Sequence, residues 1–302
     1  MPPTPTQPFL LHERSPSKMT SRLSVFAFNG TYNYNYSEGV HLDPIPLLAN
    51  QDLLDVRYIP VGLAKQNCPA QLDIIFEALN ESCEVVVFCG TDNIEELAYL
   101  FAINRLPGRR VFFVGSMYPF GHPLYDGKLS LDTLMRLRGL VEEGSWVVVG
   151  ETVARGECVR KTHSVAHDAI QPPIHLDDKA ELARPTLPMF CVKPSLLRAR
   201  VPIIMSSLGD DGGWIDWGNI DGLVVAGGGT GSIPTVLREN ILSARSGKRV
   251  VITTRCFAGP NHDDEMYPGS AQDYENDGFE VRQFNGLNPM QARLRLMLEL
   301  AT

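Results

Sequence analysis

Short apolar runs alternate with longer amphipathic segments along the first half of the chain. The apolar runs predict strands over residues 23–28, 54–61, 84–89, 109–115 and 145–152. Segments with apolar residues three and four positions apart predict helices over residues 70–82, 93–106 and 129–143. This alternation predicts an α/β fold in which helices cover both faces of a parallel sheet.

The same alternation returns after residue 200, with strands expected over 201–208, 221–229 and 248–256 and helices over 232–247 and 288–302. Residues 170–200 are rich in proline and have no sustained period, so they are typical of a connection between domains. We therefore expect a disordered leader over 1–22, an N-terminal α/β domain over 23–175, a linker over 176–200 and a smaller C-terminal α/β domain over 201–302.

Composition narrows the classes of function. The chain has 302 residues and a net charge of −8, which argues against binding to nucleic acid or to an anionic membrane surface. No apolar run approaches the ~20 residues that span a bilayer, and the N-terminal segment lacks the apolar core of a signal peptide. The six cysteines have no metal-type spacing, so we predict reduced thiols in a cytoplasmic protein.

Candidate chemistry lies in the loops that follow the predicted strands, because ligands of open parallel sheets bind beyond the carboxyl ends of the strands. Four such loops carry polar residues: "NGTY" (29–32), "CGTDNIEE" (89–96), "VGSMYP" (114–119) and "GECVRKTHS" (156–164). Taken alone, the second is better explained by helix capping, with Glu95 and Glu96 favourable to the helix dipole. The first lacks the glycine spacing of a dinucleotide loop.

Together and in this order, these segments resemble the bacterial-type L-asparaginases and asparaginase-like amidohydrolases. The family's Thr-Gly-Gly-Thr loop stands here as Phe28-Asn29-Gly30-Thr31, and its His-Gly-Thr-Asp element as "CGTD" at 89–92. Its "VGAMRP" element stands as "VGSMYP", and its Lys-Thr element as Lys161-Thr162. The glycine-rich "GLVVAGGGTGSIP" and the last helix also match, so the resemblance covers residues 23–302 and implies an asparaginase-like two-domain fold.

The resemblance implies a nucleophilic mechanism. Thr31 occupies the place of the family's nucleophile, and Thr91, Asp92 and Lys161 match its charge-linked group. A threonine hydroxyl needs such a group, because it is a weak nucleophile until its proton is taken up. Attack on a carboxamide then releases ammonia and leaves an acyl-enzyme that water hydrolyses. No metal and no cofactor are expected, although His163 and His167 are four residues apart.

A tyrosine of the loop after the first strand also assists in the family. We choose Tyr36 for this role, with Tyr34 and Tyr32 as rivals. An ordinary surface loop that covers its own strand would explain at least two of the three tyrosines equally well.

Several departures from the family pattern concern substrate recognition. Leu63 and Ala64 stand where the family binds the substrate's α-carboxylate with polar residues, and Tyr118 replaces the arginine of "MRP". We therefore expect specificity shifted away from free L-asparagine, toward a substrate without a free α-carboxylate in that place or toward a larger and more apolar one. The alternative that Lys65 or Gln66 binds an anion there stays open. The predicted substrate-binding residues are Phe28, Asn29, Tyr34, Leu63, Ala64 and Tyr118.

The sequence also leaves other functions open. The same site could catalyse acyl transfer, cyclisation or elimination, or the chain could be a non-catalytic binding protein of this fold. The resemblance also implies a homodimer or homotetramer in which a partner subunit donates an acidic residue to the site. Asp263, Asp264 and Glu265 lie in roughly the corresponding region. The expected partner is otherwise a small-molecule amide.

Overall fold

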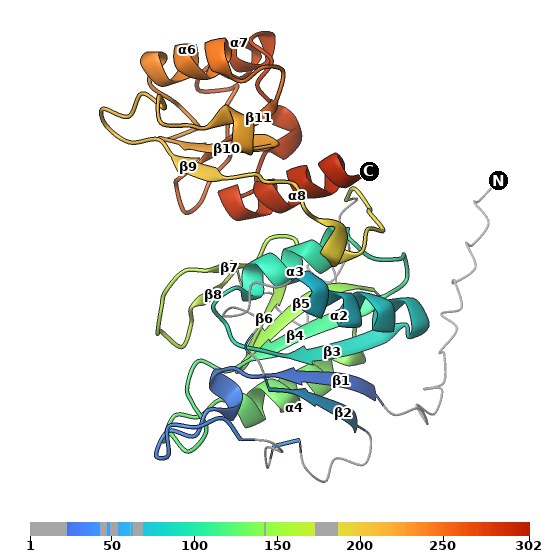
Figure 1. The fold of residues 1–302 in the computed structure, drawn as a ribbon. Helices are drawn as coiled ribbons and strands as arrows, with labels where there is room; N and C mark the ends of the chain where they lie inside the picture. Colours follow the sequence, from blue (N-terminus) through green and yellow to red (C-terminus); the bar gives the residue numbers. More distant parts are fainter. Residues whose placement is uncertain are drawn as a thin grey trace, which may run out of the picture.

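The computed structural model describes residues 23–42, 47–48, 54–60, 62, 69–141, 143–172 and 187–302. Its strands form a six-stranded sheet in the order β2-β1-β3-β4-β5-β6 and a three-stranded sheet in the order β11-β10-β9. Figure 1 shows the larger sheet below and the smaller sheet above, with the last helix, α8, between them. The predicted α/β fold with a larger N-terminal and a smaller C-terminal unit is confirmed.

The larger sheet is parallel except at one edge. Its strands are β1 (Leu23–Phe28), β2 (Leu54–Ile59), β3 (Glu84–Phe88), β4 (Arg110–Gly115), β5 (Gly144–Val149) and β6 (Thr152–Arg155). β6 runs antiparallel to β5, which corrects the single strand expected over 145–152. Gly150 has a φ of +60°, so the chain turns back directly after Val149.

Helices cover both faces of this sheet (Figure 1). On one face lie α2 (Pro69–Glu81) and α3 (Ile94–Ile103), whose apolar residues pack with Phe28, Val87 and Phe113. On the other face α4 (Gly127–Arg138) packs Leu131 and Leu134 against its own set of strand residues. The strands alternate their side chains between these two cores, because successive residues of a strand point to opposite faces.

The smaller unit repeats this arrangement. Its strands are β9 (Ile203–Met205), β10 (Gly222–Gly227) and β11 (Arg249–Thr254), and its helices are α6 (Thr235–Ala244), α7 (Ser270–Asn276) and α8 (Pro289–Ala301). Helices α6 and α7 share one core with β10 and β11, whereas α8 lies on the opposite face, toward α3. Buried residues of α3 and α8 belong to one continuous core, which joins the two units.

Short elements complete the description. A two-stranded ribbon pairs β7 (Arg160–Lys161) with β8 (Ile170–Gln171). The described residues also form the 3-10 helices η1 (Thr31–Asn33), η2 (Pro194–Leu196), η3 (Trp217–Asn219) and η4 (Arg282–Phe284). The helix η2 packs on α2, where the Ser195 backbone N–H donates to Asp73 Oδ1 at 2.9 Å. The predicted domain boundaries stay a prediction, since residues 173–186 lie outside the described part.

No helix among the described residues is both long and apolar enough to cross a membrane. The predicted leader over residues 1–22 lies outside the described residues.

Candidate active site

Three strand ends of the larger sheet bring their loops together. β1 and β3 are neighbours, and Gly30 in the loop after β1 lies directly on Gly90 in the loop after β3. A Cβ atom on Gly30 would stand 2.4 Å from the Gly90 backbone nitrogen, so only glycine fits there. At the next strand end, a Cβ on Gly115 would stand 2.8 Å from Thr91 Cγ2. The residues next to Thr31 and Thr91 are therefore in contact.

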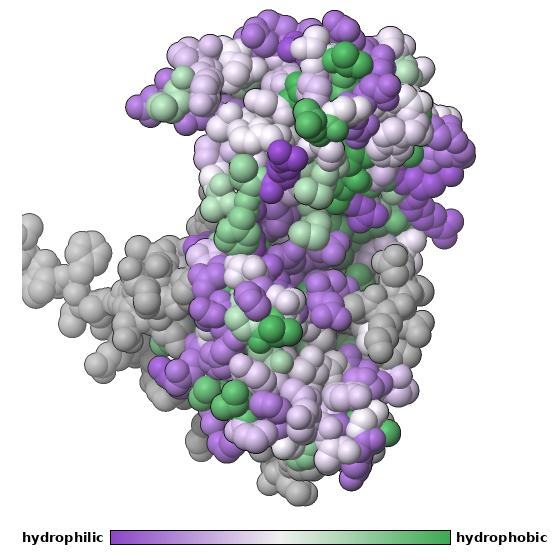
Figure 2. Space-filling model, turned by 90° about the vertical axis from the view of Figure 1, so that its left-hand side faces the viewer, coloured by the Kyte–Doolittle hydropathy of each residue, from purple (hydrophilic) through white to green (hydrophobic). Residues whose placement is uncertain are grey.

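This convergence lies at the carboxyl ends of the parallel strands. In Figure 1 the chain enters β1 on the right, and the loop that carries Thr31 follows its left-hand end. Figure 2 looks onto that side of the molecule and shows polar and apolar residues mixed over it, with an apolar area between the upper and lower units.

The central contact joins Lys161 to Thr91. Lys161 Nζ donates a hydrogen bond of 2.8 Å to Thr91 Oγ1, although the two residues are 70 positions apart in sequence. Thr91 is buried, and Asp92 Oδ1 lies 3.7 Å from the same ammonium group. The Asp92 side chain is 77% exposed, so this ion pair contributes little to stability. The structure thus places the three matching residues in one chain of polar contacts.

A buried carboxylate, which the sequence reasoning missed, holds the lysine in place. Glu95 Oε2 accepts a hydrogen bond of 2.7 Å from the Lys161 backbone N–H. Burial raises the pKa of the Glu95 carboxyl, and the hydrogen bond from Lys161 opposes that shift. The Glu-Glu pair after the Gly-Thr-Asp triplet was its only sequence signal, and the helix dipole was a sufficient explanation for it.

Thr31 is half-buried and begins the 3-10 helix η1, for which Gly30 is the N-cap residue. Within the part of the chain that the structure describes, the Thr31 hydroxyl makes no hydrogen bond. The Tyr34 backbone N–H donates a hydrogen bond of 3.2 Å to the Thr31 carbonyl oxygen, which forms the turn of η1.

The three tyrosines of this loop have different surroundings. Tyr32 is fully buried and packs on Phe88, with ring centroids 5.3 Å apart. Tyr34 is partly exposed and lies edge-on to His41, while Tyr36 is 59% exposed. The Tyr36 ring lies edge-on to His122, with centroids 5.0 Å apart, so it touches the loop that follows β4.

Tyr118 belongs to a loop that one buried carboxylate organises. Asp126 accepts hydrogen bonds from the Ser116 hydroxyl and from the backbone N–H groups of Met117 and Tyr118, at 2.6, 3.1 and 3.0 Å. The Tyr118 ring stacks on His122, with centroids 5.1 Å apart. Tyr118 and Tyr36 therefore contact the same imidazole from two different loops.

The other predicted substrate-binding residues differ in accessibility. Phe28 is fully buried in the core beneath α2 and α3. Asn29 is half-buried, and its Oδ1 accepts a hydrogen bond of 3.1 Å from Asn33 Nδ2. Leu63 and Ala64 lie outside the described residues. The pocket that these residues were expected to line stays a prediction.

Cys89 stands where the family pattern has a histidine. It is fully buried at the end of β3, and burial raises the pKa of its thiol to about 12. The group is consequently a neutral thiol near pH 7, and we assign it a packing role rather than nucleophilic chemistry.

A cavity of about 300 Å³ lies next to Lys161, between the two units. Glu95, Arg160 and Lys161 line it from the N-terminal unit, and Arg255 and Met290 from the C-terminal unit. Arg160 also joins the N-terminal unit to the C-terminal unit. Its guanidinium donates hydrogen bonds to the carbonyl oxygens of Phe257 and Gly286, at 2.9 and 3.2 Å.

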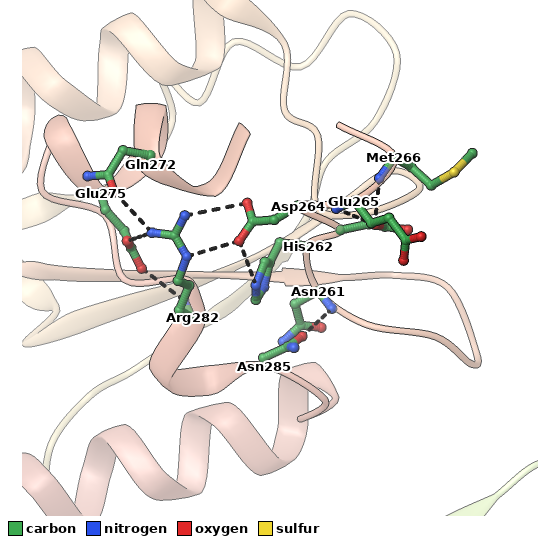
Figure 3. Close-up of polar contacts among 10 residues, drawn as sticks. Asn261, His262, Asp264, Glu265, Met266, Gln272, Glu275, Arg282 and Asn285 are labelled. Atoms are coloured by element: carbon green, nitrogen blue, oxygen red, sulfur yellow. Dashed lines mark hydrogen bonds and ion pairs between the residues drawn. The ribbon is translucent and has the colours of Figure 1, made fainter. Parts of the chain in front are cut away.

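The acidic segment proposed to serve a partner subunit is organised by Arg282 (Figure 3). Arg282 Nε donates to Asp264 Oδ2 at 3.1 Å, and the same guanidinium bonds to Glu275. Asp263 Oδ1 accepts the backbone N–H groups of Glu265 and Met266, at 3.0 and 2.9 Å. The Glu265 carboxylate points away from this cluster. Of the three candidate acids, Glu265 is thus the most available for an external contact.

Among the described residues, no three His, Cys, Asp or Glu side chains are grouped so that they could hold a metal ion. The hydroxyl, amine and carboxylate groups described above are of the types that nucleophilic acyl transfer uses.

Two family models match the chain. The model for the asparaginase N-terminal domain matches residues 42–177, and the model for the glutaminase/asparaginase C-terminal domain matches residues 200–302. The first match begins after the loop that carries Thr31. It includes Thr91, Asp92 and Lys161.

Individual relatives agree with these matches. A "Probable L-asparaginase" of Deinococcus radiodurans is 31% identical over 233 residues, which cover 72% of this chain and 70% of that protein. "L-asparaginase 2" of Bacillus subtilis is 28% identical over 237 residues, covering 72% of this chain and 60% of that protein. A solved structure described as a probable cytoplasmic L-asparaginase of Campylobacter jejuni shares the fold, with a TM-score of 0.73, 24% identity and coverage of 93% of this chain and 95% of that one.

Proposed function

This chain belongs to the asparaginase family of amidohydrolases, and we propose that it hydrolyses a carboxamide with Thr31 as the nucleophile. The observation that carries the proposal is the 2.8 Å hydrogen bond from Lys161 to Thr91, in a loop whose Gly90 touches Gly30. This contact supports the proposal because it places the Lys161–Thr91 pair in a loop that packs against the loop carrying Thr31.

The proposed reaction has two steps. Thr31 Oγ1 attacks the amide carbon, the carbon–nitrogen bond breaks, and ammonia leaves with the proton of the Thr31 hydroxyl. The Thr91 hydroxyl, oriented by Lys161, passes that proton toward the departing nitrogen. Water then attacks the ester, releases the carboxylic acid and restores the Thr31 hydroxyl. The Lys161 ammonium stabilises the negative charge that develops in both steps.

We further propose that specificity is shifted away from free L-asparagine. The support comes from sequence, because the side chains of Leu63 and Ala64 carry no hydrogen-bond donor for an α-carboxylate. The contact of Tyr36 and Tyr118 with the same imidazole adds an aromatic boundary that suits a larger, more apolar amide. Efficient hydrolysis of free asparagine would contradict this part of the proposal and leave the nucleophile assignment intact.

The test is ammonia release from a panel of carboxamides: asparagine, glutamine, N-acetylasparagine and asparagine-containing dipeptides. We expect Thr31→Ala and Lys161→Met to lose activity by about 10³-fold or more, since they remove the nucleophile and its relay. Matched controls are Ser37→Ala on the same loop and Lys128→Met, whose exposed ammonium pairs with Asp132. Full turnover by a folded Thr31→Ala variant would refute the nucleophile.

Product analysis separates hydrolysis from the other reactions considered for this site. Hydrolysis releases one carboxylic acid for each ammonia and leaves the carbon skeleton unchanged. A cyclised, transferred or unsaturated product would instead favour acyl transfer, cyclisation or elimination. Tight binding of an amide without any turnover would favour a binding protein.

We also propose that the protein self-associates, with Glu265 as the acidic residue offered to a partner subunit. The support is the orientation of its carboxylate away from the Arg282 cluster (Figure 3). A monomer in solution by light scattering would contradict this proposal.

A further inference from the structure

Several residues of the loop that carries Thr31 form hydrogen bonds to one buried side-chain amide, that of Asn33. Asn33 is two residues after Thr31, and its side chain is 1% exposed. Its Oδ1 accepts the Gly30 backbone N–H at 3.0 Å, and its Nδ2 donates to Asn29 Oδ1 and to the Leu42 carbonyl oxygen, both at 3.1 Å. Residues from both ends of the loop thus meet on a single side chain.

A fourth contact completes the set. His41 Nδ1 lies 3.1 Å from Asn33 Oδ1. Because an amide oxygen only accepts, His41 Nδ1 must carry the proton in this pair. Both N–H donors of the Asn33 amide are used and its oxygen accepts twice, so the amide is saturated.

These contacts act on Thr31 through Gly30. Gly30 is held on one side by Asn33 Oδ1 and on the other by the Gly90 backbone, where no Cβ atom would fit. Thr31 follows directly, as the first residue of η1. Loss of the hydrogen bond from Gly30 to Asn33 would remove one of the two contacts that hold the residue directly before Thr31.

We propose that Asn33 is a positioning residue for the Thr31 nucleophile. This inference rests on the proposed function, because it gives Thr31 a reacting role. Asn33 itself does not contact the substrate; it fixes the direction from which the hydroxyl approaches. A misplacement of about 1 Å in a catalytic group can lower a rate by about 10²-fold, so such an anchor has a measurable effect on kcat.

The experiment compares Asn33→Ala and Asn33→Asp with wild type, using the carboxamide of the panel from which wild type releases the most ammonia. We expect kcat to fall by about 10- to 100-fold in both variants, with KM changed less than threefold. Asn33→Asp keeps the size of the side chain, but it presents an acceptor to Asn29 Oδ1 and to the Leu42 carbonyl oxygen, so it loses both donated bonds.

Asn104→Ala is the matched control. Asn104 is also a fully buried asparagine, and its amide bonds twice to the backbone of Val192, at 2.8 and 2.9 Å. We expect this control to lose stability while each folded molecule keeps its kcat. Hydrogen exchange at the Gly30 amide gives a second readout. We expect it to accelerate in Asn33→Ala, which removes the acceptor of the Gly30 N–H, and to stay unchanged in the control.

The outcomes are distinguishable. Unchanged kcat together with faster exchange at Gly30 would make Asn33 purely structural and would overturn the proposal. Equal loss of kcat in Asn104→Ala would also overturn it, because the effect would then follow from lost stability. Turnover by Thr31→Ala would refute the nucleophile, and the positioning role would fall with it, whatever the Asn33 variants show.

Discussion

At the scale of single residues, the least expected finding is the role of Glu95. Its carboxylate is buried and bonds to the backbone N–H of Lys161 at 2.7 Å. Sequence reasoning assigned it to the helix dipole, because the pattern of a Glu-Glu pair in a first helical turn already had an explanation. The contact with residue 161 depends on how β7 lies beside α3, which no local pattern encodes.

Replacement of Glu95 by glutamine tests the effect of its burial on stability. Burial raises the pKa of Glu95 in the folded state above the unfolded value of about 4.3. At pH values between these two pKa values, Glu95 is more often protonated in the folded state than in the unfolded state. The free energy of unfolding of the wild type therefore falls as pH rises through this range. We expect Glu95→Gln to gain stability relative to wild type between pH 4 and pH 7, by about 1.4 kcal/mol for each pKa unit of elevation.

Urea unfolding at several pH values measures this difference, with Glu38→Gln in the exposed loop as the control. A difference between variant and wild type that stays constant from pH 4 to pH 7 would show that burial of Glu95 has no such cost.

At the scale of elements, the sequence predicted what depends on local pattern. The strand over 23–28 is correct to the residue, because a mainly apolar run ends at an Asn-Gly pair. The helix over 129–143 was placed too late and made too long, since α4 runs from Gly127 to Arg138. Helix α7 and the ribbon of β7 and β8 were not predicted, because short polar elements carry no hydrophobic period.

The approach of two loops at the strand ends gives a test at this scale. A Cβ on Gly30 would stand 2.4 Å from the Gly90 nitrogen, whereas a Cβ on Gly90 would make an ordinary 3.6 Å contact with Gly30. We expect Gly30→Ala to lower the free energy of unfolding by about 1–3 kcal/mol, the usual cost of overpacking. Gly90→Ala should cost clearly less.

Thermal and urea unfolding of the two alanine variants measure this asymmetry. Equal destabilisation by both substitutions would mean that the loops are not packed as closely as Gly30 and Gly90 indicate.

At the scale of the whole molecule, the candidate site is assembled by contacts that sequence spacing alone does not predict. Lys161 and Thr91 are 70 residues apart, and their pairing was anticipated only through the resemblance to a family. The two units are joined by a core shared between α3 and α8, so the site is not an isolated feature of the larger sheet. Arg160, the residue next to Lys161, makes a second junction through Phe257 and Gly286.

Arg160→Met tests whether this second junction holds the two units together. The guanidinium donates to two carbonyl oxygens of the C-terminal unit, and hydrogen bonds from a charged group contribute about 1.5–3 kcal/mol. We expect the variant to lose part of that stability and to show faster hydrogen exchange at residues 257–259 and 286. Arg198→Met, at an exposed arginine, is the control. If exchange in these segments stayed at the wild-type rate, the shared core of α3 and α8 alone would hold the units together.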